Sequence, residues 1–323
     1  MASLLSVENL QVQFQTKKGI NTAVDGVSFS VEKGRILGIV GESGCGKSVT
    51  SMSILQLLGS NARISGGSIK LDGKELIGLP EKEMCRIRGN DIAMIFQDPM
   101  TALNPTLTIG TQLMEPIMLH QNCGKKEAWT RAVDVLKRVG IAAPEKRMKE
   151  YPHQLSGGMR QRVMIAMAVS CEPRLLIADE PTTALDVTIQ AQILELMCEL
   201  REKMGTAIML ITHDMGVVAE TADDVLVLYA GKAVEYGSIE DIFERPKHPY
   251  TQGLLNSIPR LDEDVELLNT IEGTVPAPDA MPAGCRFAPR CPYGKDRCMK
   301  EKPGVYHAGN SLESCFRYEG EKE

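Results

Sequence analysis

The 323-residue sequence has no excess of positive charge, no long apolar run and no internal repeat. Its formal net charge is −6, so it lacks the overall basic field that holds nucleic acid, and we expect no nucleic-acid partner. No run approaches the roughly 18–20 apolar residues that a membrane-spanning helix requires. The N-terminal residues show no basic flank followed by an apolar core, so we also expect no signal peptide. These absences predict a cytoplasmic protein that does not span the membrane.

Disulfide bonds are a poor explanation for the cysteines of this chain. It has nine of them, an odd number, in a compartment that we expect to be reducing. Hydrophobic residues make up 43% and charged residues 24%, which are ordinary values for a folded protein and argue against extended disorder. The length of 323 residues allows a large domain plus an appendage.

Strand and helix patterns alternate along much of the chain. Continuous apolar runs are typical of strands buried on both faces, and they occur at 35–40 and 174–179. Further strands are predicted at 4–14, 91–97, 206–212 and 223–230. Helices are predicted at 47–58, 188–204 and 214–221. This alternation predicts an α/β fold with a mainly parallel sheet covered by helices.

Two segments depart from the alternation. Residues 98–171 contain helical patterns and no clear strand, and Gly140 is expected to end one of the helices. This segment therefore predicts a helical insertion. From residue 245 onward the sequence is proline-rich and irregular. We therefore expect an α/β core formed by 1–97 and 172–244, a helical subdomain at 98–171 and a C-terminal extension at 245–323.

A glycine-rich segment between a predicted strand and a predicted helix fits the pattern G-x-x-x-x-G-K-[ST] of a phosphate-binding loop. It consists of Gly41, Glu42, Ser43, Gly44, Cys45, Gly46, Lys47 and Ser48. Glycines let backbone N–H groups turn toward phosphate oxygens, and the following helix adds the positive end of its dipole. Lys47 would neutralise the β- and γ-phosphates, and the Ser48 hydroxyl would bind Mg²⁺.

A second motif ends the apolar run at 174–179 with Asp179 and Glu180. One carboxylate at such a position can reach Mg²⁺, while its neighbour can polarise a water molecule. Acidic residues after a strand are also common as helix caps. The pair therefore indicates a nucleotide site only because the chain also contains a phosphate loop.

A second glycine turn, Leu155-Ser156-Gly157-Gly158-Met159, begins another predicted helix with Ser156 as its expected N-cap. The glycines leave backbone donors uncovered, so this helix start could also receive an anion. It carries no lysine and no metal ligand. The spacing alone therefore favours an ordinary capped helix.

The motifs stand in the order found in ATP-binding cassette (ABC) ATPases, and residues 4–240 resemble that family. The resemblance rests on the phosphate loop, FQDP with Gln97, LSGGM, LLIADEP, TALD (183–186) and ITHD (211–214). Met159 stands where glutamine is more usual. The resemblance implies an α/β P-loop NTPase cassette, with a RecA-like parallel-sheet core, an antiparallel β subdomain and a helical subdomain. An irregular, cysteine-rich C-terminal element would be added to it.

The resemblance also implies roles for single residues. Glu180 would be the general base, and His213 and Gln97 would complete the catalytic set. Mg²⁺ would be held by Ser48, Gln97 and Asp179. ATP would contact the eight loop residues, Val49 and Phe14, whose ring either stacks on adenine or packs in the core. Because two cassettes of this family pack head to tail, the partner's ATP would be contacted in trans by Ser156, Gly157, Gly158, Gln161 and Asp186.

FQDPMTALNP, HPYT and the cysteine-rich tail resemble the ATPase subunits of dipeptide and oligopeptide importers, to which nickel importers are close relatives. Such a subunit would act at the cytoplasmic face of the membrane. Its partners would be a second ABC ATPase, identical or homologous, integral-membrane permease subunits and, indirectly, an extracytoplasmic peptide-binding protein. The alternatives are a transporter-free ABC ATPase, a P-loop kinase and a non-catalytic regulator. A kinase would leave LSGGM and ITHD without a role.

Four of the cysteines, Cys285, Cys291, Cys298 and Cys315, lie within 31 residues. Four thiolates at one point favour Zn²⁺ or an iron–sulfur cluster, although the spacing lacks the C-x₂-C pattern of most structural zinc sites. Peptide-importer ATPases with a similar GCRFAPRC tail hold a 4Fe–4S cluster, and this resemblance favours the cluster over Zn²⁺. Four thiols without a ligand are the third alternative. A bound cluster would staple a tail that is poor in apolar residues.

Overall fold

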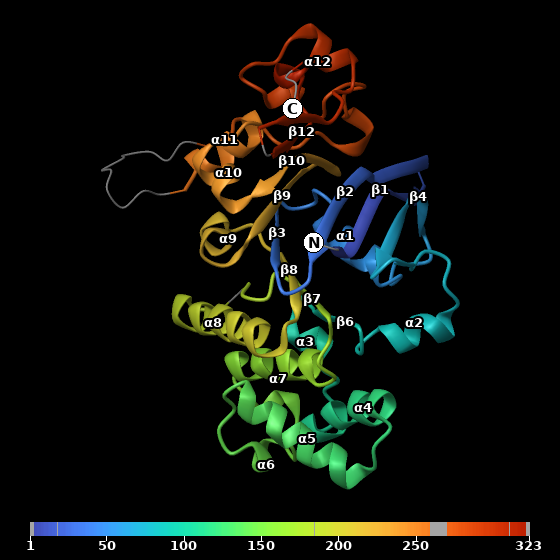
Figure 1. Ribbon diagram of the computed structural model, residues 1–323, viewed down its shortest axis with the longest axis vertical. Coiled ribbons are helices and arrows are strands. Elements are labelled where there is room, and N and C mark those ends of the chain that lie inside the picture. Colours follow the sequence, from blue (N-terminus) through green and yellow to red (C-terminus); the bar gives the residue numbers. More distant parts are fainter. Residues whose placement is uncertain (1–2, 18, 184, 259–269, 310, 321–323) are drawn as a thin grey trace. The chain divides into compact units, whose positions relative to one another are not determined.

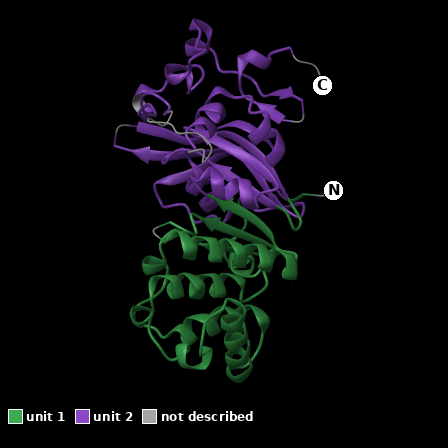
Figure 2. Cartoon of the chain, turned by 90° about the vertical axis from the view of Figure 1, so that its left-hand side faces the viewer, with its two compact units in different colours: residues 1–4, 32–35, 78–211 green, residues 5–31, 36–77, 212–323 purple. Residues whose placement is uncertain are grey.

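The computed structural model describes residues 3–17, 19–183, 185–258, 270–309 and 311–320, whose helices and strands are labelled in Figure 1. The chain divides into two compact units, which Figure 2 shows in different colours. Unit 1 comprises residues 1–4, 32–35 and 78–211, and unit 2 comprises 5–31, 36–77 and 212–323. The C-terminal extension thus falls in the same unit as the phosphate loop.

Unit 1 contains a parallel sheet in the order β6-β7-β8. Its strands are Ile92–Ile95 (β6), Leu175–Asp179 (β7) and Ala207–Ile211 (β8). Every residue of β7 and β8 is buried, which is why both appear in the sequence as continuous apolar runs. The strands predicted at 91–97, 174–179 and 206–212 are therefore confirmed.

The helices of unit 1 lie mostly in the segment where a helical insertion is predicted. They are Glu81–Ile87 (α2), Pro99–Ala102 (α3), Ile109–Gln121 (α4), Lys125–Arg138 (α5), Pro144–Arg147 (α6), Gly157–Val169 (α7) and Val187–Met204 (α8). Helices α4, α5 and α7 pack against one another (Figure 1). The α5 helix ends just before Gly140, as expected, and Gly140 has a positive φ of 75°.

Unit 2 contains a sheet in the order β2-β1-β4-β5. Its strands are Ser3–Thr16 (β1, which begins in unit 1), Gly19–Glu32 (β2), Ala62–Leu71 (β4) and Lys74–Glu75 (β5). The β1–β4 and β4–β5 pairs are antiparallel. The sequence predicts β1 but not β2 or β4, because glycines and charged residues interrupt the apolar alternation of both.

A second group of strands in unit 2 has the order β3-β9-β10-β12-β11. They are Ile36–Val40 (β3), Asp224–Tyr229 (β9), Lys232–Ser238 (β10), Tyr306–Ala308 (β11) and Ser311–Glu313 (β12). Only β3 and β9 pair in parallel among the described pairs of this group. The C-terminal extension, expected to be irregular, thus adds two strands next to β10. Strands of three residues are too short to show a period of two in sequence.

The remaining helices of unit 2 are Lys47–Ile54 (α1), Met215–Thr221 (α9), Ile239–Glu244 (α10), Pro249–Asn256 (α11) and Asp296–Lys300 (α12). The α1 helix ends four residues earlier than the sequence suggests, because Gln56 adopts a left-handed conformation with φ of 50°. The described part of the chain contains no helix that is both long and apolar enough to cross a membrane.

The bulged pairing of β1 with β4 generates a stability prediction. Gly67 has φ of 96°, and an added Cβ would lie 2.6 Å from the carbonyl oxygen of Asn9. Gly73 also has a positive φ, 81°, but an added Cβ there would meet open space. We expect Gly67→Ala to lower the free energy of unfolding by about 3 kcal/mol and the control Gly73→Ala by about 1 kcal/mol, measured by urea unfolding. Equal losses would show that the close approach of the β1 backbone contributes nothing.

Candidate functional site

The phosphate loop connects β3 to α1 within unit 2. Gly41 has φ of 150°, and a Cβ there would lie 2.1 Å from the carbonyl oxygen of Leu228, so no larger residue fits. Lys47 is 5% exposed, and its ammonium donates hydrogen bonds to the carbonyl oxygens of Gly41 (2.7 Å) and Glu42 (3.2 Å). Ser48 is exposed at the start of α1. The loop therefore encloses the Lys47 ammonium. An anion bound in the loop could replace the carbonyl oxygens of Gly41 and Glu42 as the acceptors of its hydrogen bonds.

The other loop and helix residues differ in exposure. Ser43 and Gly44 are exposed, Val49 is half-buried, and Cys45 is buried. Burial raises the pKa of the Cys45 thiol, which opposes any thiolate chemistry in the loop. Phe14 on β1 lies opposite Ala62 and is half-buried, so its ring is not enclosed in the core.

The end of β7 brings two of the predicted residues of unit 1 together. The Glu180 carboxylate accepts hydrogen bonds from the Gln97 side-chain amide (2.8 Å) and from the Thr183 hydroxyl (3.0 Å). Glu180 has φ of 46°, and its N–H donates to the carbonyl oxygen of Ile211. Such a left-handed conformation in a non-glycine residue costs energy and persists only where the surrounding structure holds it. Asp179, the preceding residue, is only 4% exposed.

The second glycine turn starts α7 in unit 1. The Ser156 hydroxyl accepts a hydrogen bond from Met159 N (3.3 Å) and caps the helix, as the sequence predicts. Ser156 and Gly157 are both exposed. Gln161, in contrast, is 2% exposed and donates to the carbonyl oxygen of Pro181. Ser156 and Gly157 are therefore the residues of the turn and helix start that are exposed to solvent, whereas Gln161 is not.

Two further predicted residues lie at or just before a helix N-cap. Asp186 is exposed and caps α8 by accepting a hydrogen bond from Ile189 N (2.9 Å). His213 is exposed in unit 2, next to Thr212, whose N–H donates to the carbonyl oxygen of Ile39 in β3 (3.1 Å). Residue 184 of the TALD motif lies outside the described residues.

The four C-terminal cysteines line one cavity of about 80 Å³, together with His248, Phe287 and other residues. Burial raises the pKa of Cys285 to about 11 and also raises the pKa values of Cys291 and Cys315. Within the described ranges, no group of three or more His, Cys, Asp or Glu side chains is arranged to hold a metal ion. The expected 4Fe–4S cluster is thus not supported by this geometry, although the four cysteines line the same cavity.

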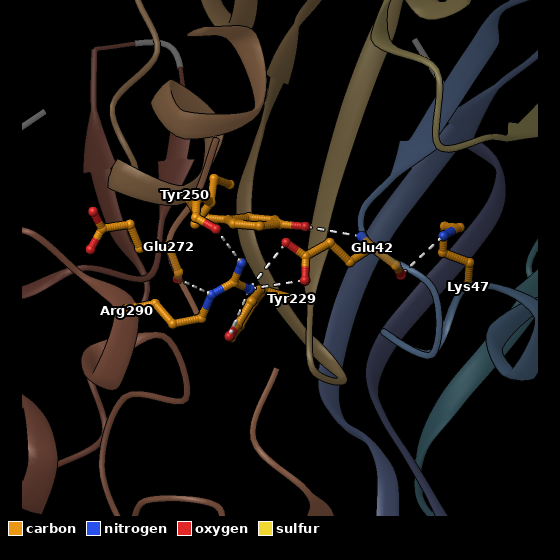
Figure 3. A network of polar contacts seen from close by, with 7 residues as sticks. Glu42, Lys47, Tyr229, Tyr250, Glu272 and Arg290 are labelled. Atoms are coloured by element: carbon orange, nitrogen blue, oxygen red, sulfur yellow. Dashed lines mark hydrogen bonds and ion pairs between the residues drawn. The ribbon is translucent and has the colours of Figure 1, made fainter. Parts of the chain in front are cut away.

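Sequence reasoning assigned no role to three residues that contact the predicted site. Thr183 donates to Glu180, and Tyr250 and Arg290 contact Glu42 of the phosphate loop (Figure 3). Tyr250 belongs to the HPYT segment and Arg290 precedes Cys291, so both lie in segments that the sequence marks as unusual without indicating their target.

Two families match parts of the chain. Residues 24–183 match the family described as ABC transporter, and residues 234–298 match the family described as oligopeptide/dipeptide transporter, C-terminal region. The phosphate loop and Gln97–Glu180 lie in the first match, and Tyr250 and Arg290 lie in the second.

Similar proteins cover almost the whole chain. It is 56% identical over 323 residues to the oligopeptide transport ATP-binding protein AppD of Bacillus subtilis (strain 168), covering 99% of this chain and 98% of that protein. It is 52% identical to the oligopeptide transport ATP-binding protein OppD of Escherichia coli (strain K12), covering 98% and 93%. Among solved structures, the dimeric post-hydrolysis state of the ATP-binding cassette MJ0796 bound to ADP and Pi matches with a TM-score of 0.66 at 27% identity, covering 73% of this chain and 98% of that one.

The motifs, the local geometry and these matches agree over nearly the full length of the chain. The chain therefore belongs to the ABC transporter family of ATP-binding proteins, with the C-terminal region of the oligopeptide/dipeptide transporters.

Proposed function

We propose that this chain is the ATPase subunit of an ABC importer for dipeptides or oligopeptides, and that it hydrolyses ATP to ADP and phosphate to power transport. The observation that carries the proposal is identity of 50–56% over nearly the whole chain to several oligopeptide and dipeptide transport ATP-binding proteins. The phosphate loop and the Gln97–Glu180 pair support the proposed ATPase activity.

In the proposed reaction, the phosphate loop binds the triphosphate of ATP. Lys47 exchanges its contacts with Gly41 and Glu42 for the β- and γ-phosphate oxygens. Backbone N–H groups of the loop and the start of α1 surround the same oxygens. The half-buried Phe14 contacts the adenine, with core packing as the alternative role for its ring.

Hydroxyl, amide and carboxylate oxygens are the donors that Mg²⁺ prefers, and the set Ser48, Gln97 and Asp179 fits this requirement. When bound, Mg²⁺ supplies charge neutralisation at the β- and γ-phosphates. Glu180 accepts a proton from the attacking water as general base. Gln97 and Thr183 orient this carboxylate by the hydrogen bonds described above. His213 contacts the γ-phosphate.

A second ATPase subunit, identical or homologous, completes each site in the proposed assembly. The exposed residues Ser156 and Gly157 at the start of α7 face the partner's ATP, and Gly158 and the exposed Asp186 lie on the same trans-acting surface. Gln161 supports this surface from within, because it is buried. The other proposed partners are membrane permease subunits, which would hold the chain peripherally at the cytoplasmic face, and an extracytoplasmic peptide-binding protein that acts through them.

A nickel importer and a transporter-free ATPase are the alternatives. Peptide-stimulated hydrolysis by the chain co-purified with its permeases would support the proposal, and stimulation by nickel complexes alone would favour the first alternative. Full activity without any permease would favour the second.

Lys47→Ala should weaken ATP binding by about 10- to 100-fold, because charge-assisted contacts to the phosphates are lost. Equilibrium binding of Mg·ATP to the full chain measures the effect. Lys126→Ala, which removes an exposed lysine of α5, serves as the control. Unchanged affinity in Lys47→Ala would contradict the proposed phosphate cradle.

Glu180→Gln should retain ATP affinity but lower turnover by about a thousandfold, since the amide cannot accept the proton of the attacking water. The variant should also trap an ATP-bound pair of subunits, detectable by light scattering. Turnover is measured with the partner ATPase and permeases present, and Glu195→Gln on the exposed face of α8 is the matched control. Hydrolysis close to that of the control would refute the role of Glu180.

We further propose that the cysteine cavity binds a 4Fe–4S cluster, with Zn²⁺ as the alternative ligand. Four thiols that line one cavity support this, and binding would require their sulfurs to reorient and lose protons. Such a group would cross-link a region of short strands and helices.

Anaerobically purified protein should contain about four iron atoms per chain and absorb in the visible range. Cys291→Ser should lower the iron content, whereas Cys85→Ser, an exposed cysteine of α2, should not. A colourless protein that contains zinc would show that the cavity binds Zn²⁺ instead of the cluster. The absence of both metals would show that the cysteines are thiols without a ligand.

A further inference from the structure

The phosphate loop is anchored at Glu42 by side chains of the C-terminal region. The N–H of Glu42 donates to the Tyr250 hydroxyl (2.9 Å), and its carboxylate accepts from Arg290 Nη1 at 3.0 and 2.9 Å (Figure 3). The carbonyl oxygen of Glu42 accepts from Lys47. All these residues belong to unit 2, and the peptide and side chain of Glu42 are thus held from different directions.

Arg290 is itself held firmly. Its side chain is 6% exposed, and its Nε and Nη2 donate to the backbone carbonyls of Glu272 (3.0 Å) and Ile271 (3.2 Å). The Tyr229 hydroxyl lies 3.4 Å from Nη1. A guanidinium with this many fixed partners loses little further freedom when it binds a carboxylate, so its contact with Glu42 is favourable and directional.

Tyr250 is fully buried, and its ring packs edge-on against Tyr229 (4.7 Å between centroids) and near Phe287 (5.4 Å). The ring position fixes where the hydroxyl points. Burial strongly raises the pKa of Tyr250, so the hydroxyl stays protonated and neutral beside the Glu42 N–H.

These contacts matter because the loop has few of its own. Three of its residues are glycines, and the N–H groups that bind phosphate cannot at the same time hold the loop. The Cys45 N–H donates within the loop to the carbonyl oxygen of Glu42 (3.2 Å). When ATP binds, Lys47 leaves the carbonyl oxygens of Gly41 and Glu42 for the phosphates, and the loop loses that internal support. The contacts from Tyr250 and Arg290 do not compete with phosphate and can persist.

We propose that Tyr250 and Arg290 are positioning residues that hold the phosphate loop at Glu42 in the shape that receives ATP. This inference rests on the proposed ATPase function and extends it to the C-terminal region, which takes part in nucleotide binding through these two contacts. The pairing with Arg290 also offsets the negative charge of Glu42, which would otherwise repel an incoming triphosphate. Pre-organisation of this kind lowers the entropy that ligand binding costs.

The test compares Mg·ATP affinity of the full chain with turnover of the assembled transporter at saturating ATP. Tyr250→Phe removes only the hydroxyl and should raise the Kd for Mg·ATP about tenfold. Arg290→Ala should do the same or more, and Arg290→Lys should restore part of the loss. Turnover at saturating ATP should stay within about twofold, because bound phosphates then hold the loop themselves.

Matched controls come from the same region. Tyr318→Phe removes a hydroxyl that donates to the carbonyl oxygen of Lys247, and Arg297→Lys alters an exposed arginine that pairs with Glu319. Both should leave the Kd unchanged. If Arg290→Ala lowers the midpoint of thermal unfolding more than Arg297→Lys does, the Kd of Tyr250→Phe alone decides whether the positioning role holds. In a double-mutant cycle, Arg290→Ala should add little to the effect of Glu42→Ala, because both remove the same contact.

The outcomes separate this inference from the proposed function. Wild-type protein that fails to bind ATP would refute both. Wild-type protein that binds ATP, with Lys47→Ala impaired and with Tyr250→Phe and Arg290→Ala both unchanged in Kd, would refute the positioning role and leave the ATPase proposal standing.

Discussion

A loop that binds phosphate through its own backbone cannot also use that backbone to hold its shape, and this constraint governs the site. Every N–H group kept free for an anion is a hydrogen bond missing from the empty loop. The loop between β3 and α1 therefore depends on neighbours: the Lys47 ammonium within it, the Leu228 carbonyl that leaves room only for glycine at 41, and the two side chains that hold Glu42. The shape of the loop thus depends on residues that are distant in the sequence, although its sequence motif is short and continuous.

At the end of β7 in unit 1, hydrogen bonds and a sharp turn of the chain fix the position of Glu180. Glu180, the proposed general base, accepts hydrogen bonds from the amide of Gln97 and the hydroxyl of Thr183, and these contacts fix the direction of its carboxylate. The left-handed backbone at Glu180 and its hydrogen bond to Ile211 turn the chain sharply after the strand. Strain is thereby placed beside the proposed chemistry, where the buried β7 and β8 strands can hold it.

The C-terminal region both extends a sheet and supplies side chains that contact the phosphate loop. Its strands β12 and β11 continue the order β3-β9-β10, so it is joined to the sheet from which the phosphate loop leaves. Its cysteines surround a small cavity, and Arg290 directly precedes one of them. A region that is poor in regular structure can contribute to nucleotide binding because a few buried, multiply bonded side chains suffice to hold one point of a loop.

Local pattern was enough to predict much of this protein. The strands β1, β3, β6, β7, β8 and β9 follow from apolar runs, because burial on one or both faces leaves a direct trace in the sequence. The start of α7 at Gly157 with Ser156 as its cap also follows from local rules. So does the presence of a phosphate loop at 41–48, because the spacing of its glycines, lysine and serine between a strand and a helix is a local motif.

Contacts between distant residues could not be predicted in this way. β2 and β4 depend on pairing with β1 rather than on their own apolar pattern, and β11 and β12 are too short to show one. The pairs Gln97–Glu180 and Arg290–Glu42 join residues 83 and 248 positions apart. The sequence by itself determined which groups are present for phosphate and proton chemistry. Only the tertiary structure decided which side chains hold them, because a hydrogen-bond partner is selected by proximity in space and leaves no periodic trace along the chain.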